Sequence, residues 1–152
     1  MIVENEYLNQ IEKIWQGNNK GYIGYDCNQR SIKDDKMLKI VFERENLALG
    51  YCVLYFEKDF CELEKYPNKI SYMPDKIAYI WEIVTDKEHL QEGIATSILN
   101  YIKDKFKEYS IYSCINLSNV PSLNLHLKMG FNTIYKFKQE NDEYAMMELK
   151  NK

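Results

Sequence analysis

The chain from Ile77 to Ala95 reads IAYIWEIVTDKEHLQEGIA, and it carries the strongest structural signal in the sequence. Residues Ile77–Thr85 are apolar at almost every position, which is typical of a strand covered on both faces. The end of the stretch places Gly93 and Ala95 on the opening turn of a helix. The first N–H groups of a helix have no internal partner, so small residues there let an anion approach the backbone closely. The stretch therefore predicts a strand–loop–helix unit with an anion site at the helix start. A glycine used only to turn the chain would give the same local pattern.

Apolar periodicity on either side of this unit predicts the remaining elements. A four-residue repeat of isoleucines continues the helix that begins near Gly93. The other expected elements are a helix at Asn5–Gln16, a hairpin of Lys39–Glu43 and Ala48–Glu57 around Arg44–Leu47, the strand Lys76–Thr85, a strand at Tyr109–Leu117, a helix at Pro121–Met129, and a hairpin of Phe131–Lys138 and Glu143–Leu149. The segments Gly17–Asp35 and Phe60–Lys76 are polar and predict loops. This order predicts an α/β fold, a mixed and mostly antiparallel sheet flanked by helices, in a single domain over residues 1–152.

Composition excludes several classes of protein. Of 152 residues, 45% are hydrophobic and 28% charged, which is the balance of a globular domain. No apolar run reaches the ~20 residues of a membrane span, and the first residues lack the layout of a signal peptide, so we expect a cytoplasmic location. The four cysteines are scattered and there are only two histidines, which argues against a metal site and for reduced thiols. The net charge of −3, with acids and lysines interleaved, argues against nucleic-acid binding.

A second motif lies after the strand at Tyr109–Leu117. Residues Asn119 to Phe131 contain the pattern N-x-x-S-x-x-x-H-x-x-x-G-F. With this pattern and the first motif together, the sequence resembles the GNAT superfamily of N-acyltransferases over about Lys39 to Leu149. The family's signatures read Q/R-x-x-G-x-G/A at a helix start and N-x-x-A/S-x-x-x-Y-x-x-x-G-F on the next helix. This chain departs from them with Leu90 in place of Gln or Arg, and with His126 in place of Tyr.

The resemblance implies an acetyl-CoA site between the two strands that flank the central helix, where Ile77–Thr85 and Tyr109–Leu117 are expected to splay apart. Pantetheine would pair with the backbone of Ile83–Thr85, a backbone N–H there would stabilise charge on the thioester oxygen, and Gly93–Thr96 would hold the diphosphate. The residues implied for cofactor binding are Ile83, Val84, Thr85, Leu90, Gln91, Glu92, Gly93, Ile94, Ala95, Thr96, Asn119, Ser122 and Lys128. Glu92 is unfavourable near a diphosphate, and Lys128 or Lys87 are candidates for compensating charge; the alternative is that both lysines are ordinary solvated side chains. Asn119 has an alternative role as a turn or N-cap residue.

Two residues are implied for catalysis. Glu82 sits among apolar residues, and a carboxylate is costly to bury without a role or a partner. The resemblance implies that Glu82 takes the proton of the incoming ammonium, whose pKa is near ~10.4; a salt-bridged or edge-facing glutamate is the alternative. His126 occupies the position implied for the acid that protonates the departing thiolate. The alternative for His126 is a histidine that packs or forms a structural hydrogen bond.

The resemblance implies an N-acetyltransferase that moves an acetyl group from acetyl-CoA to a primary amine by direct attack. We expect the acceptor to be a small molecule or a peptide, with no nucleic-acid or membrane partner, and the chain to be a monomer or a homodimer. The acceptor itself is not identified, and the helix Asn5–Gln16 with the two long loops is expected to shape its pocket. One alternative is a binding module of the same fold that grips acetyl-CoA without turnover, with Leu90 and His126 as its marks. A purely structural α/β domain is the other alternative.

Overall fold

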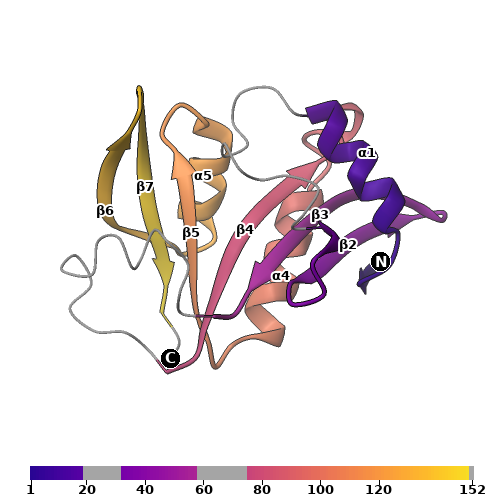
Figure 1. Cartoon of the computed structure of the whole chain (residues 1–152), viewed down its shortest axis with the longest axis horizontal. Coiled ribbons are helices and arrows are strands. Elements are labelled where there is room, and N and C mark those ends of the chain that lie inside the picture. The colour runs from indigo at the N-terminus through magenta and orange to yellow at the C-terminus, as the bar shows by residue number, and fades with distance from the viewer. Residues whose placement is uncertain (19–31, 58–74, 151–152) are drawn as a thin grey trace. The chain divides into compact units, whose positions relative to one another are not determined.

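The computed structural model describes residues 1–18, 32–57 and 75–150. Within these ranges, seven strands form the hydrogen-bonded order β1-β2-β3-β4-β5-β7-β6. The strands are β1 (Ile2–Glu4), β2 (Leu38–Arg44), β3 (Leu47–Tyr55), β4 (Ile77–Thr85), β5 (Ser110–Asn116), β6 (Asn132–Gln139) and β7 (Asp142–Leu149), and the helices are α1 (Leu8–Asn18), the 3-10 helix η2 (Lys87–His89), α4 (Ile94–Lys105) and α5 (Val120–Lys128) (Figure 1). Strand β4 runs parallel to β5, whereas β1–β2, β2–β3, β5–β7 and β6–β7 are antiparallel. The predicted mixed, mostly antiparallel sheet is confirmed.

Contacts divide the chain into two compact units. The first comprises Met1–Tyr55 with Trp81–Lys105, and the second Phe56–Ile80 with Phe106–Lys152. Strand β4 contributes to both units, because the division falls between Ile80 and Trp81. The single domain over residues 1–152 stays a prediction. Most of the two long loops, Gly17–Asp35 and Phe60–Lys76, lies outside the described residues.

The first unit begins with a strand that the sequence did not predict. Strand β1 pairs with Ile40–Phe42 of β2. Asn5 and Tyr7 then have φ values of 57° and 60°, in the left-handed region that a helix cannot use. For this reason α1 begins at Leu8 and not at Asn5. Asn5 also joins the turn to β2, because its amide oxygen accepts a hydrogen bond from the Lys39 N–H at 3.0 Å.

The predicted hairpin of the first unit is confirmed, with a shorter turn than expected. Glu45 and Asn46 have φ values of 53° and 63°, and Arg44 pairs with Leu47. Two successive residues with positive φ make a type I′ turn, whose twist matches that of the flanking strands. The two strands therefore stay paired up to Arg44 and Leu47, one residue nearer the turn on each side than predicted.

Helices α1 and α4 cover opposite faces of β3. Ile11 and Ile14 of α1 belong to the buried apolar cluster that contains Tyr51. Gly50, the neighbour of Tyr51, faces the other way because side chains alternate along a strand. A Cβ atom on Gly50 would lie 2.6 Å from Cγ2 of Ile94, the first residue of α4. The helix therefore packs directly on the strand backbone, and Figure 1 shows α4 behind β3.

The second unit contains the parallel pair and the terminal hairpin. The register of β4 with β5 runs from Ile77 opposite Ser110 to Ile80 opposite Ser113. Strands β6 and β7 form the predicted hairpin, and β6 is the edge strand. The β6–β7 register shifts between Thr133 and Tyr135, and beyond the shift the exposed residues of β6 include Lys136 and Lys138. Helix α5 confirms the predicted helix at Pro121–Met129, displaced by one residue.

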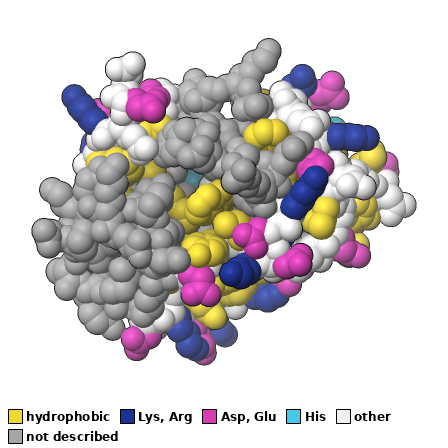
Figure 2. Space-filling model, viewed as in Figure 1, with side chains coloured by type: hydrophobic (Ala, Val, Ile, Leu, Met, Phe, Trp, Pro, Cys, Tyr) yellow, Lys and Arg dark blue, Asp and Glu magenta, His cyan; other side chains and the backbone are white. Residues whose placement is uncertain are grey.

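Charges of both signs are mixed on the surface. On the face drawn in Figure 2, lysine and arginine side chains lie interspersed with aspartate and glutamate. This mixture agrees with the interleaved charges of the sequence. No helix within residues 1–18, 32–57 or 75–150 is long and apolar enough to span a membrane.

Candidate active site

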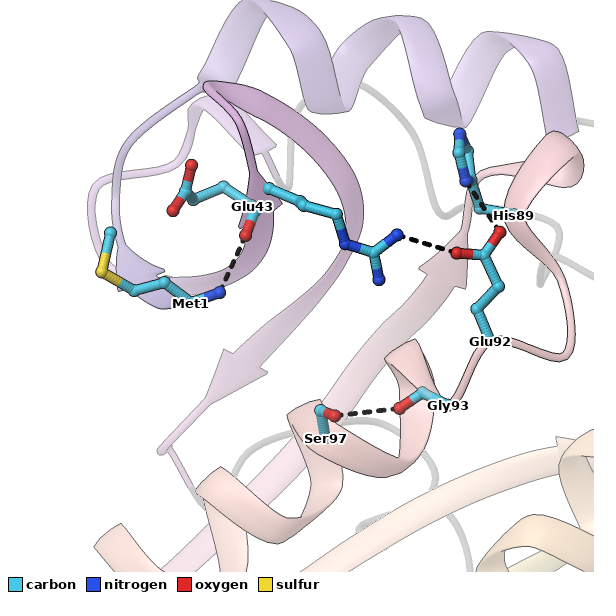
Figure 3. Close-up of polar contacts among 7 residues, drawn as sticks. Met1, Glu43, His89, Glu92, Gly93 and Ser97 are labelled. Atoms are coloured by element: carbon cyan, nitrogen blue, oxygen red, sulfur yellow. Dashed lines mark hydrogen bonds and ion pairs between the residues drawn. The ribbon is translucent and has the colours of Figure 1, made fainter.

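The loop between β4 and α4 has a backbone shape that opens the helix to an anion. Gln91 and Gly93 have φ values of 64° and 79°, and α4 begins at Ile94. The first helical bond runs from the Ser97 N–H to the Gly93 carbonyl at 2.9 Å, and the Ser97 hydroxyl donates to the same oxygen at 3.0 Å (Figure 3). The backbone N–H groups that precede Ser97 have no acceptor inside the helix. Gly93 thus lies just before the helix, and Ala95 is its second residue.

The loop that leads into this helix is exposed to solvent. Leu90, Gln91, Glu92 and Gly93 are all exposed, and Leu90 keeps 59% of its surface. A Cβ atom on Gly93 would meet no atom of another described residue within 4 Å. The partial positive charge at a helix N-terminus and the free N–H groups favour an anion in such a place. Within residues 1–18, 32–57 and 75–150, the loop that leads into α4 is therefore open to a ligand at Gly93.

Two side chains from other elements bind the Glu92 carboxylate in this loop, and Arg44 brings it a positive charge. Arg44 of β2 lies 2.9 Å from its Oε1, and Nδ1 of His89 in η2 lies 2.9 Å from its Oε2 (Figure 3). The hydrogen bond from Arg44, followed by that from His89, lowers the pKa of the Glu92 carboxyl. Lys87 and Lys128 were the candidates for compensating charge in the sequence, where Arg44 was missed. No local signal marks Arg44, because it is brought to Glu92 by strand pairing across 48 positions of sequence.

Glu82 is buried in the first unit beside a tyrosine. Its exposed fraction is 7%, and the Tyr51 hydroxyl donates to its Oε1 at 3.0 Å. Val84, two positions along the strand, belongs to the apolar cluster with α1, so Glu82 faces the same side of the sheet. Burial, and after it the charge of Glu82, raise the pKa of the Cys52 thiol. Tyr51 is a second functional candidate that sequence reasoning missed.

The residues of the cofactor prediction that lie around Glu82 and the helix start are also placed. Ile83 and Thr85 are half-buried in the last part of β4, while Val84 is buried. Ile94 is buried and anchors the helix, and Ala95 and Thr96 are half-buried. One short stretch of the first unit therefore holds the buried carboxylate, the strand end and the open helix start.

In the second unit, the predicted residues lie on and before α5. Asn119 caps the helix, and its Oδ1 accepts from the Ser122 N–H at 3.4 Å. The capping geometry supports the alternative role of Asn119 as a turn or N-cap residue. Ser122 is half-buried and its carbonyl accepts a bond from His126, and Lys128 is exposed.

His126 is fully buried and held through its Nδ1. Its Nδ1 lies 2.8 Å from the Ser122 carbonyl, and its ring meets Phe131 edge-on with centroids 4.9 Å apart. Nδ1 must carry a hydrogen, because a carbonyl only accepts. Its Nε2 is buried with no hydrogen-bond partner among the described residues. Burial lowers the pKa of His126, which favours the neutral ring with a lone pair on Nε2.

A cavity of about 540 Å³ lies beside α1 in the first unit. The lining side chains come from α1, from the start of β3 and from the segment after β4. They are Gln10, Lys13, Ile14, Gly17, Leu47, Ala48, Asp86, Lys87 and Glu88. Helix α1 is one of the segments expected to shape the acceptor pocket, and two lysines and two acids give the cavity a mixed charge.

The sequence model of the acetyltransferase (GNAT) family matches residues 5–131. Because this match spans most of the described residues and both motifs, the chain belongs to the acetyltransferase (GNAT) family. An N-alpha-acetyltransferase of Sulfurisphaera tokodaii is 23% identical over 123 residues, which cover 76% of this chain and 71% of that protein.

Solved structures agree with this assignment at the level of the fold. An N-acetyltransferase from Staphylococcus aureus Mu50 superposes with a TM-score of 0.72 at 20% identity, covering 100% of this chain and 99% of its own. Arabidopsis thaliana NAA60 in complex with acetyl-CoA superposes with a TM-score of 0.72 at 13% identity, covering 98% of each chain. The predicted GNAT-like fold is confirmed.

Acetyl-CoA is the donor that the family uses, and the residues present fit it. Its diphosphate needs free N–H donors, room for close approach and little uncompensated negative charge. The N–H groups before Ser97, the open space above Gly93 and the pairing of Glu92 with Arg44 supply these three conditions.

Proposed function

We propose that this protein is an N-acetyltransferase that transfers the acetyl group of acetyl-CoA to a primary amine of a small-molecule or peptide acceptor. The observation that carries the proposal is the open start of α4, on the same short stretch of chain as the buried carboxylate of Glu82. The family assignment supports the acetyl transfer. The geometry supports separate roles for the start of α4 in binding and for Glu82 in proton transfer.

The binding part of the proposal rests on backbone groups. The N–H groups of Gly93–Thr96 hold the diphosphate, and the backbone of Ile83–Thr85 pairs with the pantetheine arm. Leu90, Gln91 and Glu92 shape the loop, and Arg44 keeps its charge balanced. Asn119, Ser122 and Lys128 stay proposed cofactor-binding residues on and before α5. Acetyl-CoA supplies an acetyl group activated as a thioester.

Glu82 is the proposed base. An alkyl ammonium has a pKa near ~10.4, so a proton acceptor is needed before the amine can attack at neutral pH. A carboxylate held by Tyr51 in an apolar setting is suited to this role directly or through water. The amine then attacks the thioester directly, with no covalent bond to the protein.

Protonation of the departing sulfur needs less help from the protein than deprotonation of the amine. A thiol has a pKa near ~8.5, so the thiolate departs readily. His126 is proposed to return a proton only from its Nε2 in the charged form, since its Nδ1 is bound to Ser122. Because burial lowers the pKa of His126, we expect this contribution to be small at neutral pH.

The test combines binding and turnover. Titration calorimetry with acetyl-CoA should give heat, and a thiol-release assay over a panel of amines and peptides should show turnover with intersecting initial-rate lines, as direct transfer requires. Glu82→Gln should keep acetyl-CoA binding and lose about 100-fold in kcat/KM. Glu148→Gln, which alters a buried glutamate of the second unit, is the matched control for burial.

A second candidate is the binding module without catalysis, and the burial of His126 as a neutral ring favours it. Heat and thermal stabilisation with acetyl-CoA, but no thiol release on any amine, would establish that candidate. No heat and no stabilisation with any CoA ester would leave only a structural domain. Parallel initial-rate lines would contradict direct attack, although the protein would still be an acetyltransferase.

A further inference from the structure

The Tyr51–Glu82 pair joins two buried polar side chains on neighbouring strands of the first unit. Tyr51 is fully buried and Glu82 is 7% exposed, and the hydroxyl lies 3.0 Å from Oε1. The elements packed around them present apolar side chains, including Ile11 and Ile14 of α1 and Val41 of β2. Two titratable side chains of β3 interact with Glu82: the Tyr51 hydroxyl by its hydrogen bond and the Cys52 thiol by its charge effect.

We propose that Tyr51 is a positioning residue that keeps Glu82 charged and oriented for the proton transfer. The proposal rests on the proposed function, in which Glu82 is the base. In an apolar setting a carboxylate tends to take up a proton, and a protonated carboxyl cannot act as a base. A donated O–H favours the charged form and fixes the plane of the carboxylate. The Tyr51 hydroxyl therefore stabilises the charged form of Glu82 and fixes the orientation of its carboxylate.

The chain contains a matched pair that serves as an internal control. Tyr112 of β5 donates to Oε2 of Glu148 in β7 at 2.7 Å, and both side chains are buried. The two residues are direct cross-strand partners in the second unit. Loss of either tyrosine hydroxyl removes the same kind of bond from the same kind of environment. Only the loss of the Tyr51 hydroxyl should change the pH dependence of the reaction, because Tyr51 is the tyrosine of the two that contacts Glu82, the proposed base.

The experiment compares Tyr51→Phe with Tyr112→Phe in the pH dependence of kcat/KM, measured with one amine acceptor. Removing the donor raises the pKa of the Glu82 carboxyl, so the acidic limb of the Y51F profile should move upward by about 1 pH unit. The Y112F limb should coincide with that of the wild type. A Y51F limb that stays in place, or an equal shift in both variants, would overturn the proposal.

A measurement without turnover separates this inference from the proposed function. The carboxyl carbon of Glu82, assigned with the help of Glu82→Gln, is titrated by ¹³C NMR in the wild type and in Y51F. An upward shift of about 1 pH unit in Y51F supports the inference even if the wild type acetylates no amine, in which case only the proposed function fails. An unchanged titration refutes the inference even if the wild type is an active enzyme. In an active enzyme, the combined Y51F and E82Q variant should lose no more activity than E82Q alone.

Discussion

In the proposed cofactor site, Glu92 lies beside the helix start that would receive the diphosphate, and its negative charge would oppose binding there. The ion pair with Arg44 offsets part of this negative charge and keeps the carboxylate in place. His89 holds the second oxygen of the same carboxylate. The loop thus keeps a hydrogen-bonded anchor between two elements, and the exposed N–H groups nearby remain available for a ligand.

Arg44→Gln should weaken acetyl-CoA binding by roughly fivefold, because it leaves the Glu92 charge facing the diphosphate. The double variant with Glu92→Gln should recover most of the affinity, since the Glu92 charge that Arg44 balances is then absent as well. Calorimetry at low and at high salt checks this, and the loss should shrink at high salt. Lys87→Gln is the control for a lysine in the same loop. Equal losses in R44Q and K87Q, or no recovery in the double variant, would contradict the assignment.

Two residues of the candidate site could be predicted from the sequence because of their residue type. A carboxylate in an apolar strand and a glycine before an amphipathic helix mark Glu82 and Gly93 in the sequence, because each is out of keeping with its neighbours. Arg44 and Tyr51 carry no such mark. Arginine at the end of a strand and tyrosine within one are common, and only tertiary contacts bring them to Glu92 and Glu82.

At the scale of elements, the position of α4 depends on one missing side chain. The backbone of β3 at Gly50 leaves room for Ile94, and a Cβ there would also lie 3.2 Å from the Val84 carbonyl oxygen. Since α4 starts at Ile94, this contact sets where the free N–H groups of the helix stand. The packing of α4 on β3 therefore also determines the geometry of the proposed anion site.

Gly50→Ala should lower the free energy of unfolding by about 1–3 kcal/mol and weaken acetyl-CoA binding, because Ile94 must move away from the strand. Ile94→Ala in the same chain removes the clashing methyl group and should restore the binding, although not the lost apolar burial. Urea unfolding and calorimetry measure the two effects separately. The proposed coupling is wrong if G50A destabilises the fold while acetyl-CoA affinity is unchanged.

The order of the long elements was predictable because their periodicity is local. Helix α4 shows a four-residue apolar repeat, and β4 is apolar almost throughout, so both are visible in a short window. Strand β1 and the helix η2 were missed because each spans three residues, too few for a period. The early start predicted for α1 failed for a backbone reason, the positive φ values at Asn5 and Tyr7.

At the scale of the whole molecule, the buried histidine makes stability depend on pH. The pKa of His126 is lower in the folded chain than the value near ~6.5 of an exposed histidine. As the pH falls through that range, the unfolded chain binds a proton that the folded chain does not. Stability is therefore fully present above this range and falls as the pH decreases.

The free energy of unfolding should decrease between pH 8 and pH 5.5, with a contribution from His126 of at most about 1.4 kcal/mol per pH unit. His126→Phe should flatten that slope by up to one proton, whatever its own effect on stability. His126→Asn, which can still donate to the Ser122 carbonyl, should flatten it equally. Guanidinium unfolding at several pH values measures the slope, and equal slopes in the wild type and both variants would show that His126 does not titrate as described.

The edge of the sheet at β6 has a consequence for how copies of this chain behave in a crowded solution. A free strand edge is a template on which another chain can add, and long regular edges promote fibre formation. In β6 the shift between Thr133 and Tyr135 breaks the regular spacing of the outer amides, and Lys136 and Lys138 place two positive charges along the rest of the strand. A second β6 would have to bring like charges together, so the strand that terminates the sheet also discourages its extension.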